Sequence, residues 1–159
     1  MIQVQFLDWS FLVDKSLTEK IYSSVDKGGA DKCNCSMCKN YIARKHNLLE
    51  LPLIEFFRDA GVDIDKEYEV YHMGKDANGL HLYGTWFDFA GKILEGPNCK
   101  IQTTDEKFTI EHYDLKPSLS VAFLPANLPL DSFFDKVENV VQVDFIFTIP
   151  WTIGDEEPE

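Results

Sequence analysis

Apolar and polar positions follow two different periods along this chain. Before Gly61 the apolar residues recur mainly at every third or fourth position, which is typical of helices that bury one face. After Gly61 they recur at every second position, which is typical of half-buried strands. Only residues 2–6 show this alternation earlier. Helices followed by meandering strands predict an α+β fold, with N-terminal helices packed on a largely antiparallel β-sheet.

Two helical regions are predicted before Gly61. The first starts with a capping box from Ser16 to Glu19, in which the two side chains accept hydrogen bonds from amides at the helix start. Its apolar positions are Leu17, Ile21 and Val25, and the Gly28-Gly29 pair ends it. The second region runs from the cysteines to Gly61. Pro52 predicts that it divides into two short helices, because proline inside a helix is costly.

The strands after Gly61 begin with a hairpin. Residues 69–74 and 80–90 are aromatic-rich runs joined by a loop with Asn78-Gly79, a pair that favours a tight hairpin turn. Alternating runs also cover residues 107–112, 119–123 and 141–149, and Pro150 ends the last of them. We therefore predict a single domain over residues 1–153 and a flexible acidic tail over residues 154–159.

The length of 159 residues is that of one domain, and such a chain buries roughly 70% of its unfolded surface on folding. No apolar stretch approaches the ~20 residues of a membrane span, so no membrane association is expected. The first residues lack the basic and apolar segments of a secretory signal. We therefore expect a cytoplasmic location, where thiols stay reduced.

The chain is strongly acidic, with a net charge of −12. This charge argues against nonspecific nucleic-acid binding, which requires cationic groups. Residues 131–159 contain eight carboxylates against Lys136 alone. Such a surface would steer a basic protein partner toward it, with Asp135, Glu138 and Asp144 as candidate contacts. The alternative is a solvated surface on which charges cluster without a partner.

Three of the four cysteines, Cys33, Cys35 and Cys38, lie within six residues. Thiolates are ligands of structural zinc, and a Cys-x-x-Cys turn supplies two of the four ligands that zinc needs. Cys33 is the candidate third ligand. On a continuous helix His46 would lie about 12 Å along the axis and about 80° around it from Cys38, so it is excluded. Cys99, which follows a predicted turn, is the candidate fourth ligand.

Two other interpretations use the same cysteines. Cys38 lies near a predicted helix start, where the helix dipole lowers a thiol pKa, as in thiol–disulfide enzymes. A redox Cys-x-x-Cys normally follows a strand, however, and residues 26–34 have the composition of a polar loop. The third interpretation is that the cysteines are small buried hydrophobic residues at a helix–sheet junction.

The predicted hairpin brings two of the four histidines together. With an even-numbered loop around Asn78-Gly79, His72 shares a sheet face with His81 and Tyr83, within cross-strand reach. Such a face can bind a ligand or a metal, or transfer protons. Asp88 is predicted on the opposite face, so this strand adds no carboxylate to the group. Histidines that only satisfy local hydrogen bonds are the alternative.

Three segments carry a resemblance to other proteins. They are Cys35 to Tyr41 (CSMCKNY), Leu80 to Phe89 (LHLYGTWFDF) and Pro150-Trp151. With these segments the chain resembles a group of small uncharacterised bacterial proteins. The resemblance implies a shared single domain and a bacterial source, and it transfers no activity and no catalytic residue.

Together these patterns predict a cytoplasmic binding or interaction protein rather than an enzyme. Its cysteine cluster would hold a structural metal or anchor the helices to the sheet. One specific form is an immunity-type inhibitor, whose acidic end neutralises a basic partner. The alternative is an enzyme, either a thiol oxidoreductase or a metal-dependent hydrolase, that uses the cysteine cluster and the His72/His81 face.

Overall fold

The computed structural model describes residues 1–159, which form four helices and nine strands. The helices are α1 (Lys15–Ser23), α2 (Gly29–Lys32), α3 (Ser36–Leu48) and α4 (Leu51–Ala60). The strands are β1 (Ile2–Phe6), β2 (Trp9–Val13), β3 (Glu69–Lys75), β4 (His81–Glu95), β5 (Lys100–Thr104), β6 (Lys107–Ile110), β7 (Tyr113–Lys116), β8 (Leu119–Pro125) and β9 (Val140–Ile149). The predicted α+β fold is confirmed.

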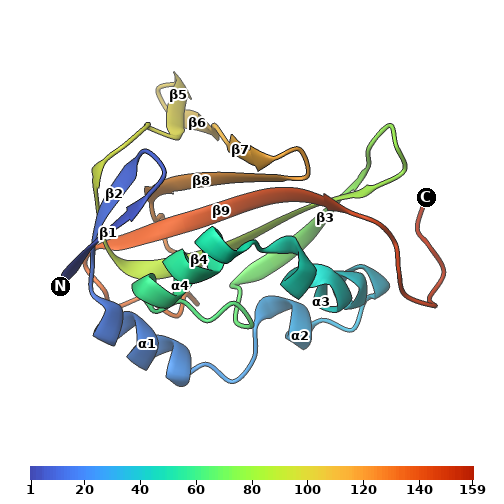
Figure 1. The fold of residues 1–159 in the computed structure, drawn as a ribbon, viewed down its shortest axis with the longest axis horizontal. Helices are drawn as coiled ribbons and strands as arrows, with labels where there is room; N and C mark the ends of the chain where they lie inside the picture. Colours follow the sequence, from blue (N-terminus) through green and yellow to red (C-terminus); the bar gives the residue numbers. More distant parts are fainter.

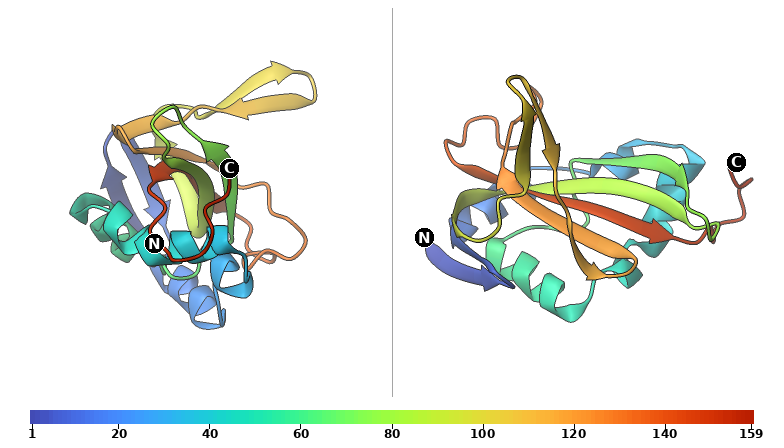
Figure 2. Two further views of the ribbon diagram at one scale, coloured as in Figure 1. Left: turned by 90° about the vertical axis from the view of Figure 1, so that its right-hand side faces the viewer. Right: turned by 90° about the horizontal axis from the view of Figure 1, so that it is seen from above.

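Seven strands form one sheet. Six of them follow the order β1-β2-β4-β9-β8-β7, in which every neighbouring pair is antiparallel, and β3 pairs with β4 beside this path. The 15-residue strand β4 is long enough to pair with two strands along one edge. Its first half pairs with β3, and its second half pairs with β2. Strands β5 and β6 form a separate hairpin, which projects from the body of the molecule (Figure 2, left).

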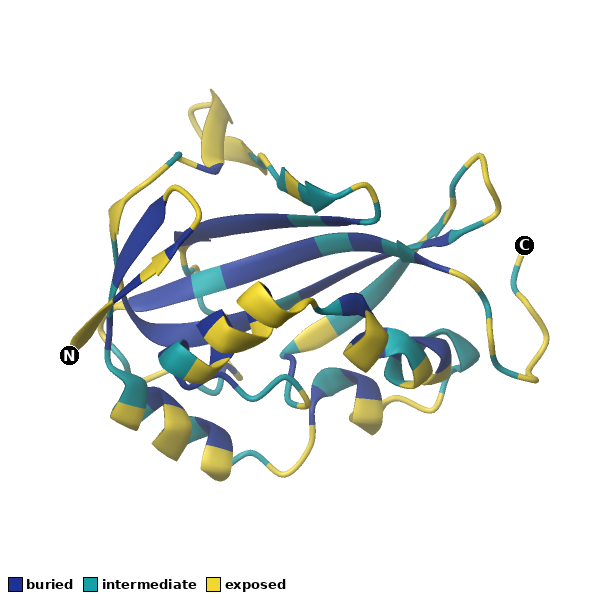
Figure 3. Cartoon of the chain, in the orientation of Figure 1, coloured by how far each residue is buried: buried dark blue, intermediate teal, exposed yellow.

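The four helices cover one face of the sheet (Figure 1). The core between them is aromatic, because Phe56 of α4 packs within 5.1 Å of Phe6, 5.4 Å of Phe11 and 5.6 Å of Phe123, measured between ring centroids. The central strands are largely buried (Figure 3). Such an aromatic layer contributes both buried area and edge-to-face contacts to stability.

The helix boundaries agree with the sequence in the second region and differ in the first. Pro52 lies in the first turn of α4, so the division into two helices is confirmed, and Gly61 ends α4 with a positive φ of 81°. Helix α1 is capped by Asp14 instead of Ser16, since the Asp14 side chain accepts from the amide of Leu17 at 3.1 Å. It ends at Ser23, well before the predicted glycine pair.

The predicted hairpin, the strand at residues 2–6 and the strands after residue 106 are all present, and β9 ends immediately before Pro150. Strands β2, β5 and β7 were not predicted. None of the helices has the length and apolar character needed to cross a lipid bilayer. Residues 154–159 form no helix or strand, although side chains of this segment contact the β4 and α3 regions. Its flexibility stays a prediction.

Candidate metal centre

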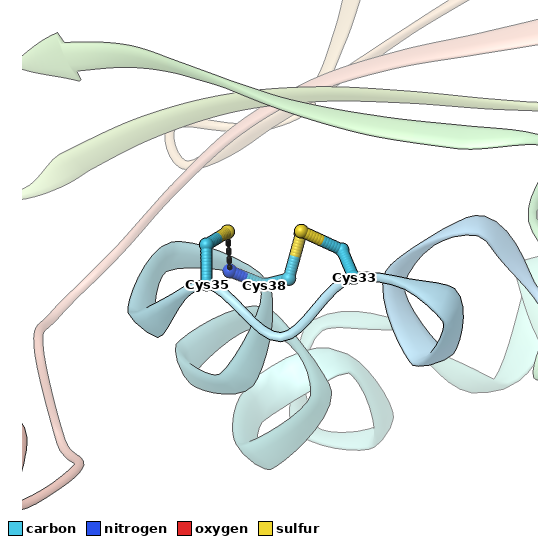
Figure 4. A group of neighbouring side chains, drawn as sticks. All are labelled: Cys33, Cys35 and Cys38. Atoms are coloured by element: carbon cyan, nitrogen blue, oxygen red, sulfur yellow. Dashed lines mark hydrogen bonds between the residues drawn. The ribbon is translucent and has the colours of Figure 1, made fainter.

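The three neighbouring cysteines converge at the junction between α2 and α3. Cys33 follows the last residue of α2, Cys35 is the N-cap of α3, and Cys38 lies in the first turn of α3. Their sulfur atoms all lie within 4.8 Å of one another, and the three side chains point to the same side of the chain (Figure 4). All are free thiols. Three thiols this close can bind a metal ion.

The segment before Cys33 is fixed by a buried carboxylate. Glu67 is fully buried, and its side chain accepts a hydrogen bond from the amide of Ala30 at 3.1 Å. Gly28 packs closely against the segment that carries Glu67, since a Cβ at Gly28 would be only 2.6 Å from the carbonyl oxygen of Asp65. Lys45 of α3 is also buried and lies 3.9 Å from the other carboxylate oxygen of Glu67. These contacts hold α2 against α3.

Two side chains dock the beginning of α3 on the sheet. The hydroxyl of Tyr83 on β4 donates to the carbonyl oxygen of Met37 at 2.7 Å. The buried side chain of Asn40 donates to the carbonyl oxygen of Pro150 at 3.1 Å and accepts from the amide of Thr152 at 2.9 Å. Helix α3 is thus joined both to β4 and to the segment that follows β9.

The thiols influence one another electrostatically. Burial raises the pKa of Cys38 strongly, and the neighbouring Cys35 and Cys33 add to this effect. Hydrogen bonds from the backbone and then the side chain of Cys35 lower the pKa of the exposed Cys33. Neighbouring thiolates repel one another unless a cation offsets their charges. Ionisation of all three thiols would therefore require a cation at the cluster.

The structure does not bring Cys99 to this cluster, which corrects its assignment as the fourth ligand. Cys99 is fully buried beside β8, where its sulfur accepts from the amide of Phe123 at 3.4 Å. The exclusion of His46 holds, because its ring lies 3.0 Å from Asp65 and it is not part of the cysteine group. The group that could hold a metal contains three protein ligands.

His72 and His81 are in contact, as the hairpin register predicted. His72 pairs with Tyr83 across the strands, and a bulge between His72 and Lys75 brings the ring of His81 within 2.8 Å of that of His72, measured from Nδ1 of His81 to Nε2 of His72. The ring of Tyr83 lies edge-on to His72 at 5.1 Å between centroids. Tyr83 therefore lies between the histidine pair and helix α3.

A carboxylate that the sequence analysis missed completes this group. Glu157 of the C-terminal segment lies 2.8 Å from Nε2 of His81, and Lys75 approaches the same carboxylate oxygen at 3.4 Å. The ring of Trp151 packs on His81 at 5.1 Å between centroids. No local pattern marks Glu157 as a partner of His81, because 76 residues separate them.

The candidate partner-binding carboxylates differ in exposure. Asp135 and Glu138 lie exposed between β8 and β9. Asp144 is buried on β9, where its carboxylate accepts from His112 at 2.8 Å and from Gln142 at 3.0 Å. Asp144 is therefore unavailable to a partner, which corrects its inclusion in the predicted surface.

No protein-family model, no curated protein and no solved structure matches the chain.

Proposed function

We propose that this chain is a binding protein that holds one zinc ion through Cys33, Cys35 and Cys38. The observation that carries the proposal is the convergence of three sulfur atoms within 4.8 Å. A Zn–S bond is about 2.3 Å long, so tetrahedral ligands lie roughly 3.8 Å apart. The three sulfur atoms therefore need to move only slightly toward one another to reach this spacing. Cys33 and Cys35 can make this movement, because both lie outside the helices as cap residues.

The ion would stabilise the junction between α2 and α3. No histidine, carboxylate or fourth cysteine belongs to the group, so a water molecule or an external ligand would complete a tetrahedral site. Thiolate ligands also require reduced cysteines, which favours a reducing compartment such as the cytoplasm. Metal binding releases thiol protons, so the affinity should fall as the pH is lowered.

Cobalt(II) substitution tests this function directly. Titration of the full chain with Co²⁺ under reducing conditions should produce a thiolate-to-cobalt charge-transfer absorption that saturates at one equivalent and disappears when zinc is added. The variant Cys35→Ser should lose the absorption. The matched variant Cys99→Ser should keep it, because that thiol lies beside Phe123. A wild-type chain without this absorption would contradict the proposal.

Binding of a basic protein partner is a second candidate function, favoured by the exposure of Asp135 and Glu138 between two strands. Exposed carboxylates near each other attract cationic surfaces, and salt screens this attraction. Association with a highly basic model protein such as lysozyme should weaken as salt is raised. It should also weaken in the double variant Asp135→Asn, Glu138→Asn. Binding that responds to neither change would contradict this function.

A further inference from the structure

Glu157, His81 and His72 form a continuous hydrogen-bonded chain at the end of the sheet. The carboxylate of Glu157 lies 2.8 Å from Nε2 of His81, and Nδ1 of His81 lies 2.8 Å from Nε2 of His72. His81 is fully buried, whereas Glu157 and His72 reach solvent. The chain thus connects an accessible carboxylate to an accessible imidazole through a buried one.

Hydrogen-bond chemistry fixes the direction of this chain. The hydrogen bond from His81 and then that from Lys75 lower the pKa of Glu157, so its carboxylate is ionised and only accepts. His81 must therefore carry its proton on Nε2, which leaves the lone pair on Nδ1. His72 then donates from Nε2 and keeps a lone pair on its own Nδ1. Only this tautomeric arrangement satisfies both contacts while the imidazoles are neutral.

The free nitrogen of His72 is accessible. Its Nδ1 makes no hydrogen bond within the chain and is not fully buried. Burial, followed by the neighbouring His81, lowers the pKa of His72. This shift favours the neutral imidazole, whose lone pair is available. A neutral imidazole whose other N–H is held by a base is a nucleophile of the kind that enzymes activate.

We propose that His72 is a nucleophilic acyl-acceptor site, with His81 and Glu157 as the residues that position and polarise it. A bond forms between Nδ1 of His72 and the carbonyl carbon of an activated ester or thioester. The bond from that carbon to the leaving group breaks, and its electron pair departs with the leaving group. The Nε2 proton of His72 moves to Nδ1 of His81, whose imidazolium is paired with Glu157.

The surroundings favour an acyl donor over a phosphoryl donor. Glu157 and its neighbours Glu156 and Glu159 are carboxylates, and Lys75 is the cation that contacts Glu157. An anionic phosphoryl donor would be repelled by these carboxylates. An uncharged acyl donor would not.

The proposal is tested by acylation of the full chain with diethyl pyrocarbonate near pH 7, with the rate at each histidine measured by peptide mass spectrometry. His46 is the internal control, because it also contacts a carboxylate, Asp65 at 3.0 Å, but has no second imidazole. Although His46 is an exposed residue and His72 is only half-buried, His72 should react about ten times faster or more. A rate at His72 equal to or below that at His46 would overturn the proposal.

Two variants separate activation from simple exposure. Glu157→Gln should slow acylation of His72 and leave the rate at His46 unchanged, and Glu157→Asp should restore part of the rate. The pH profile adds a second readout, because loss of the carboxylate should change the pH at which His72 becomes reactive. An unchanged rate and pH profile in Glu157→Gln would exclude the relay.

Discussion

The hydroxyl of Tyr83 donates a 2.7 Å hydrogen bond to the carbonyl oxygen of Met37, the residue immediately before Cys38. This bond joins the central strand β4 directly to the cysteine cluster. Burial, with a contribution from Cys38 and Cys35, raises the pKa of Tyr83 to about 12, so the phenol remains a donor at neutral pH. The sheet thus helps to position the proposed metal ligands.

Removal of this hydroxyl should weaken zinc binding without unfolding the chain. In Tyr83→Phe the carbonyl of Met37 loses its partner, and the turn that carries Cys35 and Cys38 becomes less well fixed. Loss of a group that orients metal ligands typically lowers affinity about tenfold or more. The measurement is a zinc competition titration with a chromophoric chelator.

Tyr113→Phe is the control for this prediction, because Tyr113 of β7 packs against Trp9 of β2 and not against helix α3. Its zinc affinity should equal that of the wild type. If both variants bound zinc equally, the contact between Tyr83 and Met37 would have no role in the site.

The amide of Asn40 should be important for the attachment of the C-terminal segment. Replacement with alanine leaves the carbonyl of Pro150 and the amide of Thr152 without their partner. Pro150 and Thr152 are exposed, so water can replace part of each lost hydrogen bond. Asn40→Ala should therefore lower the free energy of unfolding measured in urea by about 1 kcal/mol. It should also speed protease cleavage after Trp151. Asn47→Ala, at an exposed position of the same helix, should change neither quantity.

Asp88 should make stability depend on pH. Burial raises its pKa from 3.8 to about 7, and one carboxylate oxygen is buried without a hydrogen-bond partner. A carboxyl group with a higher pKa in the folded chain binds its proton more tightly there, so its contribution to stability falls as the pH rises from about 4 to about 7. Above pH 7 this cost is on the order of 4 kcal/mol, since one pKa unit corresponds to about 1.4 kcal/mol.

Asp88→Asn should remove this cost. The variant should be more stable than the wild type at pH 8, and the difference should shrink toward pH 4 in urea unfolding experiments. Asp105→Asn, at an exposed position in the β5–β6 turn, should leave the pH dependence unchanged. Parallel curves for Asp88→Asn and the wild type would show that Asp88 is ionised without penalty.

The fold was predictable where local signals agree with tertiary packing. Alternation marks β1 and β9, and Pro52 and Gly61 mark the start and end of α4. Strand β2 lacks alternation because nearly all of its residues are buried, and β5 lacks it because all of its residues are exposed. Such strands are recognisable only from their pairing partners.

The N-cap of α1 was predicted wrongly because two good capping residues lie close together. Asp14 and Ser16 both suit an N-cap, and a long-range contact accompanies the observed choice. Thr18 lies inside the helix that starts after Asp14, and its hydroxyl accepts from the amide of Ala90 on β4. No signal near Ser16 reveals this bond.

The candidate site was predictable only in its local parts. Close spacing in the sequence reveals Cys33, Cys35 and Cys38, and the hairpin register reveals the contact between His72 and His81. The positions of Cys99 and Glu157 depend on contacts between segments that are far apart in the sequence. A predicted turn therefore led to a ligand role for Cys99, and the acidic composition of residues 154–159 led to a flexible tail that included Glu157.

Native mass spectrometry of the full chain, purified without chelator and under reducing conditions, tests the central claim most directly. The zinc proposal predicts a mass increment of one zinc ion in the wild type and in Cys99→Ser, and none in Cys35→Ser. Thiol titration of the zinc-bound chain should find Cys33, Cys35 and Cys38 protected, and denaturation with a chelator should release them. A wild-type chain that carries no metal and whose cysteine cluster titrates freely would contradict the proposal.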